Sequence, residues 1–424
     1  MKDKLQTAVI ILLSLSAILL FALTSIDGTN LFSVVTADRS SEQDPENIGP
    51  LMPVSAVFND GTQTTLIRET RLLTPYFDAL RPILVELLGS ADTPVSISTA
   101  EWCALLGGKS VLLDYGTVLP LAVIGGSAEN RLAQLSADAL LIALNGESAQ
   151  LCLYADGVCY ATPTALRSAD LEALLLQREG EEVTYAYTLG AAASRLTPHS
   201  AVPLSAVGAS SLQRTPLCDS TGVYERERQA MILEAFGFDS YTARSYADAS
   251  WGRVFLTDLG TLRTGGDGSI RFVFEAESTA RTLGDPTHCA GLAARILNDC
   301  LYGLTAVPRY VLSAVETDGI YTTASFDAYV DGAVLLSQNG SRTAARFVFA
   351  GEHLIQAELA LFTVSFTEAT AQPPLSPQVL LAGLVGNGTG GRLSAVYLEA
   401  DERWNAAFCV LPTLRGGNGA NQHG

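Results

Sequence analysis

Histidine and cysteine are the residues whose spacing would reveal chemistry most readily in this chain, which has 4 and 7 of them respectively. Zinc proteases carry two histidines four positions apart with a glutamate after the first, and no such motif occurs. His288-Cys289 stands at the start of an expected helix and could suggest a metal ligand or a thiolate. Because no further Cys or His follows at ligand spacing, we predict that no metal binds there.

The glycine-rich run from Gly386 to Gly391 fits the pattern of a dinucleotide-binding loop. Such a loop follows a strand and opens a helix, whereas here an expected helix precedes the run and a strand follows it. Arg392 and Leu393 also stand where a phosphate-binding loop requires Lys and then Ser or Thr. We interpret the run as a flexible connection and predict no cofactor.

Other catalytic motifs are also missing from the sequence, including the G-x-S-x-G nucleophile elbow and S-x-x-K with its partner motifs. Glu181 and Glu182 fall in an expected polar loop, where solvent would surround both carboxylates. The Asn339 and Asn387 sequons match glycosylation acceptors and also fit turns. We therefore predict no catalytic residues, leave the binding residues unknown, and predict that the protein is not an enzyme.

The composition is that of a folded, acidic protein. Of 424 residues, 48% are hydrophobic and 17% charged, which is typical of globular chains, and this length favours two or three domains. Asp and Glu number 44 against 26 Lys and Arg, giving a net charge of −18. A negative field of this size repels nucleic acid and anionic headgroups, so we expect no nucleic-acid partner.

The N-terminal segment from Leu5 to Ile26 is free of charge and long enough to cross a bilayer as a helix. Its apolar side chains favour insertion by about 3–7 kcal/mol. Lys2 and Lys4 precede the segment, and mainly acidic residues follow it. The positive-inside rule then leaves the N-terminus in the cytoplasm and the rest of the chain outside. We predict one uncleaved transmembrane helix; a cleaved signal peptide is the alternative, but Ala22-Leu23-Thr24 is a poor cleavage site.

The cysteines are odd in number and mostly have apolar neighbours, as Cys152 and Cys409 do. We interpret them as small buried hydrophobic residues rather than as a disulfide framework. Cys289 and Cys300 share a face of one expected helix but lie roughly 16 Å apart at its rise per residue. That separation is too long for a bridge between them.

Periodic segments predict an α+β fold, with antiparallel sheets packed on helices and a transmembrane helix at the start. In the first exported region, apolar positions from Leu73 to Leu88 have helical spacing, and Pro82 indicates a kink or a late start. Strands are expected at 111–115, 137–144, 149–154 and 158–162. The Ser-, Ala- and Pro-rich stretch 196–220 indicates a domain boundary.

The second half of the chain repeats one plan, a helix followed by a meander of strands. A helix is expected over 223–236, with strands at 253–257, 261–263 and 269–275. Asp285 as N-cap and Pro286 at the first helical position predict another helix. Strands are expected to follow at 310–317, 321–329, 333–336, 342–349 and 354–366, then a short helix to Leu384 and a hairpin at 393–399 and 406–411.

These segments divide the chain into an ordered set of predicted parts. They are a cytoplasmic stub with the transmembrane helix (1–26), a tether (27–50), an N-terminal exported domain (51–195), a central helix-plus-meander module (220–282), a C-terminal helix-plus-meander module (283–414) and a disordered tail (415–424).

Several short segments resemble those of YycH-type proteins, in the order that this family has them. Val111 to Leu121 is similar to the strand and loop of the first extracytoplasmic region, where an apolar strand leads to an aromatic-Gly pair and Leu-Pro-Leu. The segment Thr261 to Gly268 resembles the central hairpin. Phe326 to Val334 resembles the strand-turn-strand of the YycH/YycI C-terminal module, with Ala333 in place of the usual Pro.

The resemblance implies an accessory regulator of a sensor histidine kinase, WalK, in a cell-wall two-component system. It implies contact rather than catalysis, with the kinase and a sister YycI-type regulator as partners and the membrane as the site of action. Two other hypotheses stay open from the sequence. One is an envelope hydrolase, which would need a deep polar cleft with converging carboxylates or histidines. The other is a structural envelope protein without a signalling role.

Overall fold

The computed structural model describes residues 51–412 except 126–131, 156, 176–178, 194–195, 205–210, 250, 259, 275–281, 339, 368–390 and 401–402. The predicted transmembrane helix, tether and tail lie outside these residues, as does the predicted short helix that ends at Leu384. Within them, no helix is both long enough and apolar enough to span a membrane. The described elements form two largely antiparallel sheets, each packed on a few helices, which confirms the predicted α+β class. The pairing of β17 with β21 in the larger sheet is parallel.

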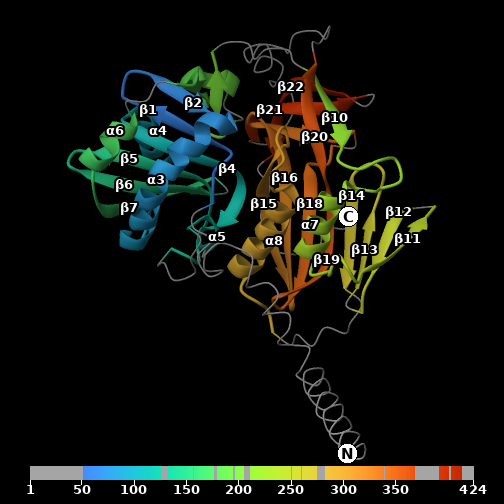
Figure 1. Ribbon diagram of the computed structural model, residues 1–424. Helices are drawn as coiled ribbons and strands as arrows, with labels where there is room; N and C mark the ends of the chain where they lie inside the picture. The colour runs from blue at the N-terminus through green and yellow to red at the C-terminus, as the bar shows by residue number, and fades with distance from the viewer. Residues whose placement is uncertain are drawn as a thin grey trace, which may run out of the picture.

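The first half of the chain forms a small sheet, which Figure 1 shows beside the larger one. In the described residues it has nine strands in the order β3-β7-β6-β5-β4-β1-β2-β8-β9. Their bounds are β1 (Ser55–Asn59), β2 (Thr64–Ile67), β3 (Val95–Ile97), β4 (Ser110–Pro120), β5 (Ser136–Asn145), β6 (Ser148–Ala155), β7 (Val158–Arg167), β8 (Glu181–Tyr185) and β9 (Ala201–Pro203).

Helices cover both faces of the small sheet. On one face lie α3 (Thr70–Ser90), α5 (Leu121–Gly125) and α6 (Ala169–Leu175), and their apolar side chains share a core with alternate residues of the strands. On the other face α4 (Thr99–Gly107) inserts Trp102 and Leu106 into a second core. A short 3-10 helix, η1 (Ala186–Ala193), follows β8.

The second half of the chain forms a larger sheet. Its described strands run in the order β11-β12-β13-β14-β19-β18-β16-β17-β21-β22-β10-β20, with β15 paired to β16. Their bounds are β10 (Ser211–Pro216), β11 (Arg244–Asp248), β12 (Gly252–Leu256), β13 (Gly260–Thr264), β14 (Ser269–Phe274), β15 (Arg309–Asp318), β16 (Tyr321–Val330), β17 (Ala333–Leu336), β18 (Thr343–Ala350), β19 (His353–Ala360), β20 (Phe362–Thr367), β21 (Gly391–Ala400) and β22 (Arg403–Pro412).

Two helices, α7 (Arg226–Ala235) and α8 (Pro286–Leu301), lie on one face of this sheet, as Figure 1 shows. The α8 helix begins as the sequence predicts, because the Asp285 side chain accepts a hydrogen bond from Thr287 N and Pro286 stands at the first helical position. Alternate strand residues such as Phe272 and Phe347 pack on the helix side. The central and C-terminal strands belong to one sheet, since β14 pairs with β19.

Several expected elements differ from the observed ones. Of the two alternatives predicted at Pro82, a kink or a late start, the late start is wrong, because α3 begins at Thr70, before both of its prolines. Burial of its apolar face outweighs the roughly 3 kcal/mol that an interior proline costs. The single strand expected over 354–366 is two strands, β19 and β20, because the chain changes partners at Leu361. There the Leu361 N–H donates to the Gly268 carbonyl oxygen at 2.9 Å.

Candidate functional site

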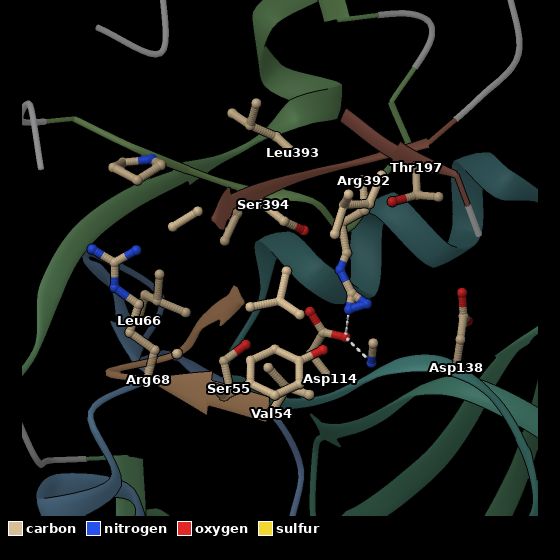
Figure 2. A pocket seen from close by; sticks show the side chains of 18 residues that line it. Val54, Ser55, Leu66, Arg68, Asp114, Asp138, Thr197, Arg392, Leu393 and Ser394 are labelled. Atoms are coloured by element: carbon tan, nitrogen blue, oxygen red, sulfur yellow. Dashed lines mark hydrogen bonds and ion pairs between the residues drawn. The ribbon is translucent and has the colours of Figure 1, made fainter. Parts of the chain in front are cut away.

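The two sheets meet along a polar junction made by residues from both halves of the chain. From the small sheet come β1, β2, β4, β5 and β9, and from the large one come β16, β17, β21 and β22. They enclose a cavity of about 70 Å³, shown from close by in Figure 2. The junction is the candidate functional site, because in the described residues it holds a buried ion pair that joins the two sheets.

The ion pair joins Asp114 of β4 to Arg392 of β21, and Figure 2 shows the guanidinium reaching down to the carboxylate. Their side chains are 15% and 12% exposed respectively. The Asp114 carboxylate also accepts a hydrogen bond from the Gly116 N–H at 3.1 Å. Burial raises the pKa of Asp114, and the positive charge of Arg392 and the Gly116 hydrogen bond oppose that rise without cancelling it.

The backbone between η1 and β9 holds Arg392 in place. The Thr197 N–H donates to the Gly391 carbonyl oxygen at 2.9 Å, and Leu196 forms a parallel bridge with the same glycine. This segment of the small-sheet half therefore fixes the start of β21, one residue before Arg392. Asp138 of β5 is buried beside the pair and lines the same cavity.

Two further contacts cross the junction, one from β15 and one from β16. Arg309 of β15 donates to the Val54 carbonyl oxygen at 3.0 Å, and burial lowers the pKa of Arg309 to about 10. Tyr329 of β16 lies against Gly116, where a Cβ would come within 3.2 Å of the Tyr329 hydroxyl oxygen. A larger residue at Gly116, whose φ is +83°, would press on both sheets.

The turn between β16 and β17 packs on the small sheet as well. Asp331 and Gly332 have φ values of 47° and 74°, as a two-residue hairpin turn requires. A Cβ on Gly332 would overlap the Arg68 side chain, so this turn and β2 are in direct contact. Arg68 in turn forms an ion pair with Glu181 of β8 at 2.9 Å.

His199 lies just beyond the cavity and is 2% exposed. Its ring packs edge-on against Tyr154 and Trp102, with centroid distances of 4.5 Å and 6.0 Å. Neither ring nitrogen has a hydrogen-bond partner in the described residues. Burial, with a smaller contribution from Arg392, lowers the pKa of His199 to about 3. The imidazole is therefore neutral at physiological pH.

This arrangement suits a fixed joint better than a substrate site. A cavity of about 70 Å³ has room for a few water molecules at most, whereas ligand pockets measure about 300–1,000 Å³. Asp114, one of the two carboxylates that line it, is occupied by its ion pair with Arg392. No group of three or more His, Cys, Asp or Glu in the described part of the chain could hold a metal ion.

No protein-family model matches the sequence, and no curated protein matches it either. Among solved structures, the crystal structure of YycH from Bacillus subtilis is similar, with a TM-score of 0.54 at 11% identity. The match covers 88% of this chain and 96% of that one. The chain has a YycH-like fold.

The described residues that the sequence singled out for chemistry lie in separate elements of this YycH-like fold. His288 is half-buried in the first turn of α8, and the Cys289 thiol donates to the Gly351 carbonyl oxygen at 3.4 Å. Of the glycine-rich run, residues 386–390 lie outside the described residues, and Gly391 begins β21. The loop expected at Glu181 and Glu182 is wrong, since both lie in β8. All seven cysteines are described, and all are free thiols.

Sequence reasoning missed the junction residues, although one signal was present. Asp114 is the single charged residue within the apolar strand from Val111 to Leu121. A carboxylate in such a strand needs a buried cation or hydrogen-bond donors, because burying it alone is costly. The signal could have identified Asp114 but not Arg392, which lies 278 positions later in the chain.

Proposed function

We propose that this chain is a membrane-anchored, extracytoplasmic regulatory protein that modulates a sensor histidine kinase by protein–protein contact. The observation that carries the proposal is the YycH-like fold, which extends over 88% of the chain. The segments that resemble YycH-type proteins point the same way, and they lie in both sheets. Val111 to Leu121 falls in β4 and the start of α5, and Phe326 to Val334 falls in β16 and β17.

The N-terminal sequence supports the anchoring part of the proposal. An uncharged run of about 22 residues follows Lys2 and Lys4, and it has the length and composition of a transmembrane helix. In the proposed arrangement this helix packs beside the kinase helices. Ser14, Ser16 and Ala17 are its closest-approach positions, because small residues let two helix backbones come near each other.

Contact regulates a kinase only if it favours one kinase state over the other. A difference in binding free energy of a few kcal/mol between those states is enough to shift the population strongly. The exported sheets engage the kinase sensor domain or a sister YycI-type regulator. The polar junction serves this role by keeping the two sheets in one orientation, so that a contact on one sheet moves both.

The proposal is tested by deleting the gene for this chain and measuring transcription that depends on the cell-wall two-component system. We expect the transcription to change and the full chain to restore it. Affinity purification of the full chain from native membranes should also recover a sensor kinase or a sister regulator. Unchanged transcription, together with a purified complex that lacks both partners, would instead support a structural envelope protein.

The topology needs a separate measurement. Protease added to intact cells should digest the portion after residue 50 and spare the N-terminal stub. Digestion that occurs only after the cells are permeabilised would rule out the extracytoplasmic placement.

A further inference from the structure

The face of the large sheet opposite α7 and α8 carries a row of charged side chains. The strand register places Val254, Arg263, Arg271, Glu358, Arg346 and Ser325 directly opposite one another on six neighbouring strands. Side chains opposite each other on adjacent strands have Cβ atoms about 4.5–5.5 Å apart. We call Arg263, Arg271 and Arg346, the three basic members, the arginine row.

The helix cover explains why these residues point away from the core. On β14, Ile270 and Phe272 belong to the core beneath the helices, so Arg271 between them faces the other side. The same alternation places Arg346 between Ala345 and Phe347 on β18. Arg346 is exposed, and the Arg271 side chain stays 40% exposed although it forms an ion pair with Glu358 at 3.2 Å.

One contact within the arginine row, between Arg263 and Arg271, is electrostatically unfavourable for the folded chain. Arg263 and Arg271 are direct cross-strand neighbours, and like charges in that position destabilise a sheet. Trp251 offsets part of this cost, since both guanidinium groups lie 5.8 Å from the centre of its ring. A destabilising pair that an aromatic side chain holds in place is typical of a binding surface rather than of a stabilising one.

The charge along the row is opposite to that of the chain. Its three arginines face one carboxylate, Glu358, which leaves a local excess of +2 in a chain of net charge −18. The buried pair of Arg342 with Asp327, at 3.0 Å, adds no net charge beside the row. Asp248 and Asp267 lie beyond Trp251, so the positive charge is confined to the row.

The lining of an open groove on this face suits a peptide segment. Arg271 and Arg346 line an open groove of about 680 Å³, whose walls also include Trp251, Ser325, Thr343 and Glu358. Guanidinium groups bind carboxylates through two parallel hydrogen bonds, and the hydroxyl groups along the groove suit peptide N–H and C=O groups. A long uniform polyanion would be repelled by the rest of the chain, whereas a short acidic segment meets only this surface.

We propose that the arginine row is a docking surface for an acidic segment of a partner protein. The inference deepens the proposed function, because it names the surface on which a contact regulator holds its partner. The partner segment lies across the strands, with carboxylates on Arg263 and Arg346 and apolar carbons against Trp251.

The direct test uses the purified full chain in detergent and a fluorescent twelve-residue peptide of alternating Glu and Ser, with binding measured by fluorescence anisotropy. The variant Arg263→Glu/Arg346→Glu should bind the peptide about tenfold more weakly or worse. The control variant Arg81→Glu/Arg226→Glu changes two arginines of α3 and α7 by the same total charge. It should bind within about twofold of the wild type.

Three outcomes would overturn the inference. Two are equal weakening of peptide binding in both variants and no peptide binding by the wild type. The third is that inorganic polyphosphate displaces the peptide at a lower concentration of negative charges than free polyglutamate needs. The last result would assign the surface to a phosphate polymer. Circular dichroism and thermal unfolding check that both variants fold.

A cellular measurement separates this inference from the proposed function. The row variant is expressed in cells that lack the chain, and two-component transcription is compared with that in wild-type and deletion cells. Full restoration by the row variant overturns the docking surface and leaves the regulator proposal standing. Deletion without any transcriptional effect counts against the regulator, while the peptide titration still decides the docking surface.

Discussion

The small and large sheets differ in how many of their faces are covered, and the difference is visible in single strands. In β5 of the small sheet, all seven residues from 137 to 143 are buried, because α3 covers one face and α4 the other. In β18 of the large sheet, exposure alternates: Ala345, Phe347 and Phe349 are buried, while Arg346 is exposed. Only one face of β18 lies under helices.

The comparison separates a structural role from an interaction role. A sheet that is covered twice has little surface left for a partner, and its core tolerates few substitutions. A sheet that is covered once keeps a face whose side chains can change without loss of packing. In this chain that face carries the arginine row, so the large sheet is the one equipped for recognition.

Alanine substitutions on β5 and β18 test most directly whether the small sheet is covered on two faces and the large sheet on one. Leu141→Ala and Ile142→Ala, on opposite faces of β5, should each lower the free energy of unfolding by about 2–5 kcal/mol. On β18, Phe347→Ala should cost about 3–5 kcal/mol and Arg346→Ala within about 0.5 kcal/mol. Urea unfolding followed by circular dichroism measures all four. A large difference between the two β5 variants would mean that one of its faces is not packed.

Substitution at the junction tests whether the two sheets are mechanically joined. Arg392→Met should lower the free energy of unfolding by about 3 kcal/mol, because it leaves the Asp114 carboxylate buried without its partner. Asp114→Leu combined with Arg392→Met should cost less than the sum of the single variants, by more than about 1 kcal/mol. Additive costs in this double-mutant cycle would show that the pair does not couple the sheets.

The buried His199 gives the covered sheet a pH dependence. Its pKa is about 3 in the folded chain, below the 6.5 of an ordinary histidine, so the unfolded chain binds the proton first as pH falls. Well above pH 6.5 the imidazole is neutral in both the folded and the unfolded state, and no stability is lost. Between pH 6 and pH 4 this group should lower the stability of the wild type by about 2 kcal/mol.

The measurement compares the pH dependence of unfolding free energy in the wild type and in His199→Leu, which should lack that part of the slope. His353→Leu, at an exposed position, serves as the matched control. Identical slopes in the wild type and His199→Leu would mean that the buried imidazole is solvated or hydrogen-bonded in solution.

Alanine substitutions at two glycines test the contact between the β16–β17 turn and β2, and their expected effect on stability is the smallest. Gly332 and Gly319 have φ values of 74° and 62°, so alanine at either position costs about 1 kcal/mol in backbone strain. A Cβ at Gly319 meets nothing within 4 Å, whereas one at Gly332 overlaps Arg68. Gly332→Ala should therefore destabilise the chain by about 1 kcal/mol more than Gly319→Ala in thermal unfolding. Equal effects would show that the turn can move away from β2.

Local chemistry explains which elements could be predicted from the sequence. The Asp285-Pro286 helix start and the strand at Ala333–Leu336 depend on neighbouring residues, and both were predicted at the observed positions. The fold class followed from hydrophobic periodicity in the same way. The edge strand β11 was missed because most of its residues are exposed and carry no apolar alternation.

The candidate site could not be predicted, because its parts come together only through the order of strands in the two sheets. Arg68 and Gly332 carry no local pattern that would indicate their contact. Arg392 was noted only as a departure from a phosphate-loop motif, although its charge lies against Asp114. The sequence contained each partner, but not the pairing between them.

The position of the last hairpin has a consequence for how the chain is made. The β21–β22 hairpin stands between β17 and β10, and Ser211 of β10 bonds to Asn405 of β22, 194 residues later. At about 5–20 residues per second, β10 waits roughly 10–40 s after its synthesis for that neighbour. Until then the nascent chain has an unpaired strand edge at β10, and Asp114 lacks its partner Arg392. This interval is therefore when the chain most needs a chaperone.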